Sequence, residues 1–267
     1  MNRNILSAIA MIGSLFCFVC GCKDTENNTI TEPTADSKAY NTYAVVVGME
    51  NSAFAGQCPG AGLDASRMKD LLSSYCTNVA YFRDSNATKV AVTSALKSAI
   101  ARAGDGLVIF YYSGHGGSEP FPDTGIEEED GSDEFYCLYD TWMRDNEMWD
   151  IIKTSKGRVF CINDCCHSRT LFRSPSLKIS VPLSWDYNLT ENKPFSLLVW
   201  SGCPDDTYSY GSATGGQFTN ALLRHFKSSK TYEELWKEIK EDYILQTFED
   251  PQSTAIGSGF ANKRIFQ

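Results

Sequence analysis

Short runs of apolar residues constrain the fold of this chain more than any other feature of its sequence. The runs cover residues 43–48, 79–82, 106–113, 157–163 and 195–201. They are apolar almost throughout, whereas a strand with one face in water alternates apolar and polar side chains. Between them, apolar residues recur at helical spacing in residues 63–75, 90–103, 146–154, 214–227 and 231–246. Buried strands that alternate with helices predict an α/β fold with a mainly parallel sheet covered on both faces.

The first residues read as a transport signal. The basic residue Arg3 precedes an apolar stretch over Ile5–Cys20, which is short for a membrane span and typical of a signal-peptide core. The stretch ends in Val19-Cys20-Gly21-Cys22, which resembles a bacterial lipobox, where the last cysteine is acylated. An ordinary cysteine-rich secretory signal is the alternative. The lipobox predicts a lipid anchor on Cys22, and hence a protein of the bacterial cell envelope that faces the periplasm or the exterior.

The rest of the chain divides into a tether and one domain. We expect a lipoprotein signal peptide over residues 1–21, a polar, flexible tether over 22–41 and a folded domain over 42–267. Within that domain two long loops interrupt the pattern, a strongly acidic one over 118–142 and a proline-punctuated, exposed linker over 169–193. We expect the protein to be a monomer.

The charge balance narrows the choice of partners. The chain has 24 basic and 33 acidic residues, for a formal net charge of −9. A nucleic-acid partner is disfavoured, because binding to phosphates depends on clustered basic side chains. A cationic substrate is compatible with this balance.

The cysteines favour buried thiols over a disulfide framework. Export would permit disulfides, and the chain has 10 cysteines. Several lie in or just after apolar runs, where buried thiols are common. Cys58 and Cys76 form the only pair that we would test for a disulfide.

Two apolar runs end in residues that can carry chemistry. The run over 106–113 leads into Gly114-His115-Gly116-Gly117, and the run over 157–163 leads into Asp164-Cys165-Cys166. In parallel sheets the ligand site lies beyond the carboxyl ends of the strands. His115 and one of the two thiols are therefore expected to meet as base and nucleophile, with the amide of Gly116 or of Cys166 to stabilise an oxyanion.

Two other readings remain open at this point. His115 can be a satisfied turn histidine and the cysteines core residues, or a metal can bind Cys161, Cys165, Cys166 and His167, although that spacing matches no common zinc pattern. His225, in the segment expected to be helical over 214–227, is interpreted as a helix-surface residue.

The motifs around His115 and Cys166 resemble those of the caspase-like peptidases, and specifically of their metacaspase branch. The Gln-Ala-Cys-x-Gly signature of caspases proper is absent. Further segments that resemble the family are 45–48, 58–68, 201–206 and 215–219, so the resemblance covers roughly residues 42–260. It implies a caspase-like α/β/α sandwich for the domain over 42–267.

The resemblance also implies roles for individual residues. Cys166 is the expected nucleophile and His115 the group that activates it, with Cys165 as a neighbour. Cleavage after Arg or Lys is implied by the positions that match the family's specificity pocket and substrate-binding segment, namely Asp64, Ser113, Asp164, Ser201 and Asp205. A buried carboxylate pair is costly unless a cation neutralises it, which agrees with this reading. A plain helix N-terminal charge is the alternative for Asp64.

Many relatives of this kind bind calcium, but the match here is incomplete. Asp130, Asp133 and Asp145, with Glu147, offer the oxygen ligands that calcium prefers. Asn146 and Arg173 stand where the family often has Asp. We therefore expect that no cofactor is required, with calcium as a possible addition and a solvated acidic loop as the simpler explanation.

The leading hypothesis is a lipid-anchored cysteine endopeptidase acting on protein or peptide substrates that contain basic residues. It forms an acyl-enzyme and cleaves itself in the exposed linker, after Arg169, Arg173, Lys178 or Lys193. Arg169 departs from the glycine that usually follows His-Ser. The rival from another class is a catalytically silent caspase-like binding lipoprotein. A related Arg-specific family, such as clostripain or gingipain, would show a different surround of the cysteine.

Overall fold

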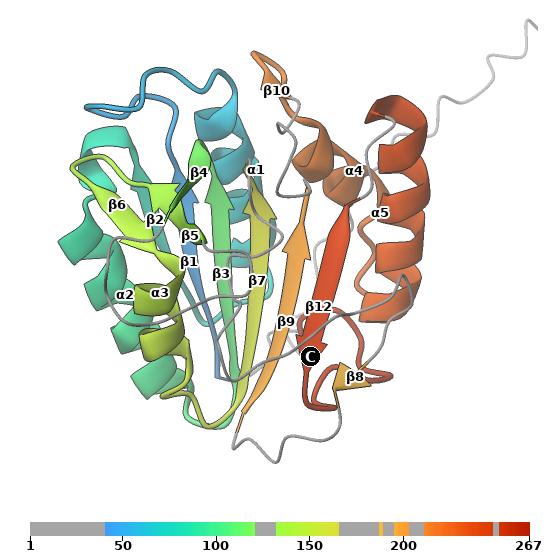
Figure 1. Ribbon diagram of the computed structural model, residues 1–267. Helices are drawn as coiled ribbons and strands as arrows, with labels where there is room; N and C mark the ends of the chain where they lie inside the picture. Colours follow the sequence, from blue (N-terminus) through green and yellow to red (C-terminus); the bar gives the residue numbers. More distant parts are fainter. Residues whose placement is uncertain (1–40, 121–131, 166–186, 189–194, 203–210, 248–250) are drawn as a thin grey trace, which may run out of the picture. The chain divides into compact units, whose positions relative to one another are not determined.

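A seven-stranded sheet forms the centre of the structure, in the order β2-β1-β3-β7-β9-β12-β8 (Figure 1). The computed structural model describes residues 41–120, 132–165, 187–188, 195–202, 211–247 and 251–267. The strands are β1 (Thr42–Gly48), β2 (Asn78–Arg83), β3 (Leu107–Ser113), β7 (Arg158–Asp164), β8 (Tyr187–Asn188), β9 (Ser196–Ser201) and β12 (Gln252–Ile256). All described residues belong to one compact unit, Pro33–Gln267.

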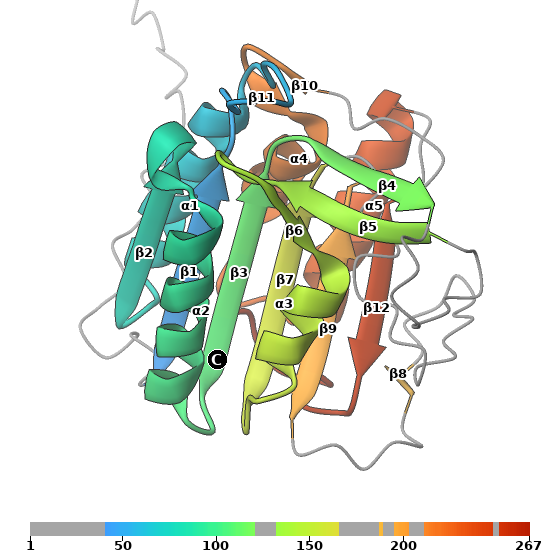
Figure 2. The same cartoon turned by 60° about the vertical axis from the view of Figure 1, so that its left-hand side comes forward.

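Alternate side chains of each central strand enter two separate hydrophobic cores, one on each face of the sheet. Val45 of β1 packs in the core that α2 (Lys89–Ala103) and α3 (Asp145–Ile152) cover. The neighbouring Val46 packs in the core under α1 (Ala61–Ser73), α4 (Gln217–His225) and α5 (Tyr232–Thr247). Because both faces are buried, the strands need no polar face, which explains their continuous apolar sequence. Figures 1 and 2 show the resulting three layers of helices, sheet and helices.

The sheet confirms the predicted fold class and differs from the prediction at one edge. β1 pairs in parallel with β2 and β3, and β7 pairs in parallel with β3 and β9. β12 runs antiparallel to β9, and its arrow points the opposite way in Figure 1. The sequence did not predict β12, because its residues Gln252-Ser253-Thr254-Ala255-Ile256 are half polar and only the last two are buried.

A second sheet occupies part of the segment that was expected to be a long loop. Its strands are β4 (Gly116–Pro120), β5 (Ser132–Cys137) and β6 (Trp142–Arg144), in that order and antiparallel. They lie on the same side of the central sheet as α2 and α3 (Figure 2). The loop prediction over 118–142 was therefore wrong for these strands, because β4 begins with two glycines, β5 begins with polar residues and β6 is only three residues long, so none shows the apolar run of a buried strand. A two-residue hairpin, β10 (Gly211–Ser212) with β11 (Gly215–Gly216), precedes α4.

The proposed disulfide pair is ruled out by the position of α1. Cys58 lies before this 13-residue helix and Cys76 after it, so about 20 Å of helix separates them, whereas a disulfide needs Cα atoms within about 7 Å. Within the described residues, no helix is long and apolar enough to cross a membrane. The predicted signal peptide, the tether and Cys22 lie outside the described residues.

Candidate active site

The register of the central sheet brings the two reactive segments to the same edge. Ser113, the last residue of β3, pairs with Asp164, the last residue of β7, and with Gly48 of β1. His115 lies two residues beyond Ser113, and Cys165 lies one residue beyond Asp164. Cys166, the predicted nucleophile, follows Cys165 directly and lies outside the described residues, as does Asp205.

The backbone of His115 is held between the central sheet and the small sheet. The Tyr112 hydroxyl donates a hydrogen bond to the His115 carbonyl over 2.7 Å, and the Cys137 N–H donates to the same oxygen over 3.0 Å. The ring is held as well, because its Nε2 lies 2.9 Å from the backbone carbonyl oxygen of Gln57. This contact leaves Nδ1 as the ring nitrogen available to a thiol. The Gln57 carbonyl was not anticipated, since a backbone acceptor leaves no mark in the sequence.

The close approach around Gly114 explains one of the glycines next to His115. A Cβ atom there would lie 2.7 Å from the Tyr112 hydroxyl oxygen and 2.8 Å from Cβ of Met49. The predicted oxyanion donor, Gly116, is the first residue of β4 and pairs with Tyr136. The neighbouring pair, His115 and Cys137, is joined by a hydrogen bond from the Cys137 N–H. Hydrogen-bonded and non-hydrogen-bonded pairs alternate along an antiparallel ladder, so Gly116 and Tyr136 are a non-hydrogen-bonded pair and the Gly116 N–H points away from β5.

The thiol before the predicted nucleophile belongs to the core. Cys165 is fully buried in the apolar cluster on the α2 and α3 face, together with Cys161 of β7. Burial raises the pKa of the Cys161 thiol far above its ordinary value, which disfavours the thiolate that a metal requires. Among the described residues, no group of three or more His, Cys, Asp or Glu side chains is arranged to hold a metal ion.

Two buried carboxylates, those of Asp64 and Asp164, interact on the face of the central sheet that α1 and α4 cover. Asp64, in the first turn of α1, is 1% exposed, and Asp164, at the end of β7, is 4% exposed. Asp64 Oδ2 accepts hydrogen bonds from the Gly216 N–H over 2.7 Å and from the Ser113 hydroxyl over 3.2 Å. Its other oxygen, Oδ1, is buried and has no hydrogen-bond partner among the described residues. The structure thus brings together three of the sequence-predicted substrate residues.

The proximity of the two carboxylates changes the ionisation of Asp64. Burial, followed by the negative charge of Asp164, raises the pKa of the Asp64 carboxyl from its ordinary value to about 7. The hydrogen bonds from Gly216 and Ser113 and the positive charge of Arg67 act in the opposite direction and are weaker. Asp64 is therefore more than a helix N-terminal charge, because its environment strongly disfavours the anion that such a position normally favours.

Glycines before α4 allow the chain to pass directly over both carboxylates. A Cβ atom on Gly215, whose φ is +103°, would lie 2.2 Å from Asp64 Oδ1, and one on Gly216 would lie 2.2 Å from Asp164 Oδ2. Every other residue at these two positions would collide with a carboxylate. The sequence placed both glycines in a family-like segment but gave no reason to connect them with Asp64 and Asp164.

The remaining predicted substrate and metal positions lie on other elements or outside the described residues. Ser201 ends β9, is 1% exposed and comes from the strand next to β7. Asp130 and the side chain of Asp133 are not among the described parts. Asp145 is buried at the start of α3, where its Oδ1 accepts a hydrogen bond from the Asn146 N–H over 2.7 Å.

Glu147, the fourth candidate calcium ligand, already has partners. Its Oε1 lies 2.5 Å from the Lys89 ammonium group, and its Oε2 accepts a hydrogen bond from the Arg144 N–H over 3.0 Å. A cation on the carboxylate opposes a second cation. The Lys89 pairing therefore disfavours calcium at Glu147, while the site predicted from Asp130, Asp133 and Asp145 stays a prediction.

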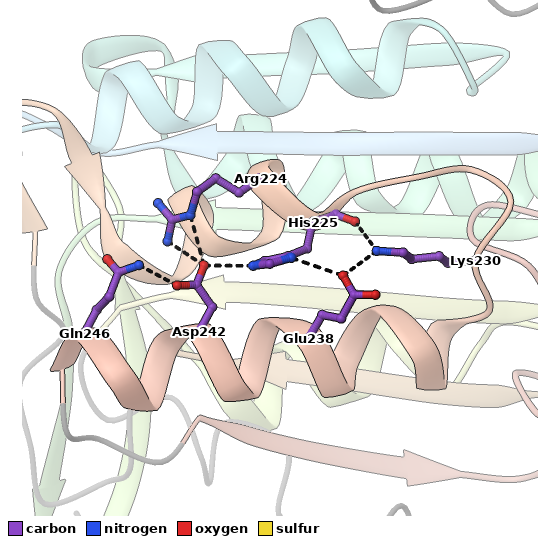
Figure 3. Close-up of polar contacts among 6 residues, drawn as sticks. All are labelled: Arg224, His225, Lys230, Glu238, Asp242 and Gln246. Carbon is purple, nitrogen blue, oxygen red and sulfur yellow. Dashed lines mark hydrogen bonds and ion pairs between the residues drawn. The ribbon is translucent and has the colours of Figure 1, made fainter. Parts of the chain in front are cut away.

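His225 takes part in a network of charges between α4 and α5, away from the carboxylate pair (Figure 3). Its Nδ1 lies 3.1 Å from Glu238 Oε2, and its Nε2 lies 2.9 Å from Asp242 Oδ2. Arg224 donates two hydrogen bonds to Asp242, over 2.9 Å and 2.7 Å. The helix-surface interpretation is correct in position, but the ring is half-buried and links the two helices.

The comparisons with known proteins agree with this geometry. A family model described as the caspase domain matches residues 41–253, which is most of the chain. The chain belongs to the caspase domain family. The matched part of this caspase domain contains both buried carboxylates, His115 and the whole central sheet apart from the last residues of β12.

Solved structures support the caspase fold. A protein from Geobacter sulfurreducens matches with a TM-score of 0.64 and 23% identity, covering 85% of this chain and 98% of that one. Caspase-1 from Spodoptera frugiperda matches with a TM-score of 0.54 and 12% identity, covering 84% of this chain and 94% of that one. No curated protein matched the sequence. The caspase domain makes this chain a member of a family of cysteine peptidases.

Proposed function

We propose that this caspase domain is a cysteine endopeptidase of the metacaspase branch that cleaves peptide bonds after Arg or Lys. The observation that carries the specificity is the buried pair of Asp64 and Asp164 at the sheet edge where His115 also lies. Two carboxylates at 1% and 4% exposure have a high desolvation cost, which a guanidinium or ammonium group would offset.

In the proposed reaction the Cys166 thiolate attacks the carbonyl carbon of the scissile bond. The developing negative charge on the carbonyl oxygen is stabilised by the backbone N–H of Gly116. His115 takes the thiol proton and returns it to the leaving amine, so that the C–N bond breaks and an acyl-enzyme remains. Water then attacks the thioester carbonyl while His115 accepts a proton from it. The C–S bond breaks, the new carboxyl end of the product leaves, and His115 returns the proton to the Cys166 sulfur. The Gln57 carbonyl holds the imidazole through Nε2 during both steps.

The substrate side chain would enter between the two carboxylates and the Ser113 hydroxyl. The unpartnered Asp64 Oδ1 offers an acceptor to a guanidinium N–H. Ser201 and Asp205 complete the proposed substrate-binding set. Gly215 and Gly216 are required next to this contact, since a side chain at either position would collide with a carboxylate oxygen.

The test is the hydrolysis of a fluorogenic peptide with Arg before the reporter, compared with matched peptides that carry Lys, Gln or Asp. We expect Cys166→Ala and His115→Ala each to reduce turnover by at least about 10³-fold, because each removes half of the dyad. Cys165→Ala is the matched control, since the adjacent thiol lies in the core and should leave turnover nearly unchanged. Unchanged turnover in either dyad variant would refute the mechanism, and a preference for Asp would refute the specificity.

The same preparation addresses three further parts of the proposal. Addition of EGTA should leave turnover unchanged, because Lys89 already pairs with Glu147 and no cofactor is required. Self-cleavage after Arg169, Arg173, Lys178 or Lys193 should appear in the intact mass of the active protein and be absent in Cys166→Ala. An arginyl chloromethyl ketone should label Cys166. A folded protein that is neither labelled nor active would favour the silent binding lipoprotein instead.

A further inference from the structure

The start of α4 contacts both carboxylates of the site. Gly216, at the N-cap position, has no side chain to cap the helix, and its N–H donates to Asp64 Oδ2. Asp164 supplies the missing cap from β7: its Oδ2 accepts a hydrogen bond from the Thr219 N–H over 2.9 Å. This is the bond that an N-cap side chain normally makes to the third residue of its own helix.

Thr219 makes a second contact to the same oxygen, and that contact has a fixed direction. Its hydroxyl donates to Asp164 Oδ2 over 2.7 Å, and the Tyr111 hydroxyl lies 2.6 Å from the same threonine oxygen. A threonine hydroxyl has one hydrogen, so Tyr111 must be the donor to Thr219. Burial and the charges of Asp64 and Asp164 raise the pKa of the Tyr111 hydroxyl well above its ordinary value, so Tyr111 stays a donor.

The two carboxylates therefore differ in how their oxygens are hydrogen-bonded. Asp164 Oδ2 accepts an N–H and an O–H, both from a residue that is itself fully buried, and the O–H is polarised by a second hydroxyl behind it. Asp64 Oδ2 also accepts one N–H and one O–H, from Gly216 and Ser113, but the buried Oδ1 of Asp64 has no partner among the described residues. Hydrogen bonds to a carboxylate favour its charged form.

We propose that Thr219 is a positioning residue that keeps the negative charge of the empty site on Asp164 and the exchangeable proton on Asp64. This inference rests on the proposed function, because the cation that displaces the proton is the Arg or Lys side chain of the substrate. Binding of the cation then ionises Asp64 and releases one proton at pH values below its pKa. The affinity for a cation rises with pH and levels off once Asp64 is ionised in the empty site.

The groups that surround Asp64 support this assignment. Among the described residues, the titratable and charged groups facing it are Asp164 of β7, Arg67 of α1 and Tyr111 of β3. Arg67 is engaged elsewhere, since its Nη1 donates to the Thr214 carbonyl over 3.1 Å and to the Asn220 side-chain oxygen over 3.0 Å. Arg67 therefore leaves Asp64 Oδ1 available to an incoming cation.

The experiment uses agmatine, a small guanidinium compound, and measures its binding to the full-length protein by calorimetry between pH 5.5 and 8.5. Two buffers of different ionisation enthalpy give the number of protons released. For the wild-type protein we expect nearly one proton released at pH 6, almost none at pH 8.5, and a midpoint of the affinity change near the pKa of about 7 of Asp64.

Thr219→Val removes the hydroxyl and keeps the shape and the N–H. We expect the midpoint to rise by up to about one pH unit, because the lost hydrogen bond weakens the Asp164 anion and lets the shared proton move from Asp64 to Asp164, and such a bond corresponds to about one pKa unit. In peptide hydrolysis KM should rise by up to about fivefold at pH 7 with little change in kcat, because a one-unit shift lowers the ionised fraction of Asp64 at pH 7 from about one half to about one eleventh. Thr219→Ser should restore the midpoint and KM. Tyr111→Phe should shift the midpoint in the same direction by less, and it replaces Thr219→Val if that variant does not fold.

Thr247→Val is the matched control, because it removes a buried hydroxyl of α5 that donates to the Tyr243 carbonyl and not to a carboxylate. It should leave the midpoint and KM unchanged. If Thr219→Val lowers thermal stability but keeps the wild-type midpoint and KM, its role is structural and the inference is wrong. If wild-type protein neither binds agmatine nor cleaves the Arg peptide, the proposed function fails and the inference fails with it.

Discussion

At the scale of single residues, the site depends on a carboxyl group, that of Asp64, whose surroundings disfavour its charged form. Asp64 is acidic in isolation, yet in the folded chain burial and Asp164 raise its pKa to about 7. Because the pKa of Asp64 differs between the folded and the unfolded chain, the free energy of unfolding depends on pH at this residue. Function and stability are therefore opposed at this position, as they often are where a protein prepares a charged site.

Asp64→Asn tests the effect of this carboxyl group on stability. Because the folded pKa lies above the unfolded value, the contribution of Asp64 to stability is fully present below about pH 4 and is lost as the pH rises to about 7. We expect Asp64→Asn to match the wild-type free energy of unfolding near pH 4 and to exceed it by about 2 kcal/mol at pH 8. Urea unfolding at both pH values measures this, and a wild type more stable than the variant at pH 8 would contradict it.

At the scale of secondary-structure elements, α4 contacts a carboxyl group of raised pKa at its first turn and one of lowered pKa at its last turn. Its first turn holds the carboxylate pair, and its last turn holds Arg224 and His225 against α5. Although burial opposes it, hydrogen bonds from Arg224 and His225 lower the pKa of the Asp242 carboxyl below its ordinary value. The stabilising effect of Asp242 is present above the unfolded pKa and is lost as the pH falls through the lowered folded value.

Asp242→Asn should therefore show the opposite sign to Asp64→Asn. We expect it to lower the free energy of unfolding by about 1–2 kcal/mol at pH 7, and the difference from wild type to fade below about pH 4. KM for the Arg peptide should not change, because the network lies at the other end of the helix. Asp150→Asn, which breaks an exposed pair with Lys153, is the control and should have almost no effect on stability.

The elements also show which parts of the structure were predictable. The parallel strands β1, β3, β7 and β9 are apolar over most of their length and could be located from the sequence. β5 and β12 could not, because each is partly polar, and β12 in addition pairs with β9, from which α4 and α5 separate it in the sequence. Pairing partners of this kind are a property of the folded chain and not of a short window.

At the scale of the whole molecule, the site combines predictable and unpredictable contributions. The place of His115 directly after a buried strand indicated this residue, and the resemblance to the caspase-like peptidases implied Asp64, Asp164 and Ser113. The sequence did not assign the Gln57 carbonyl, the glycines over the carboxylates or Thr219 to the site. For Thr219 the reason is distance along the chain, since α4 begins more than fifty residues after Asp164. Backbone groups and small side chains become functional only through the packing that brings them together.

The proposed lipid anchor is also a property of the whole chain. We expect the wild-type protein to sediment with membranes and to incorporate labelled fatty acid, because the acyl chains on Cys22 hold the mature protein in the bilayer. Cys22→Ala should be found in the soluble fraction without label. Cys20→Ala leaves a small residue before Gly21-Cys22 and is the matched control; loss of label there as well would indicate that the acylation signal was wrongly placed.

The position of His115 has a consequence for the rate of any reaction that uses its imidazole. β3 ends at Ser113 and β4 begins at Gly116, so His115 joins two sheets without an intervening loop. Its backbone and its Nε2 are fixed by Tyr112, Cys137 and Gln57 before a substrate arrives. The conformational entropy of placing this ring is thus lost once, when the chain folds, and does not have to be lost again in each turnover.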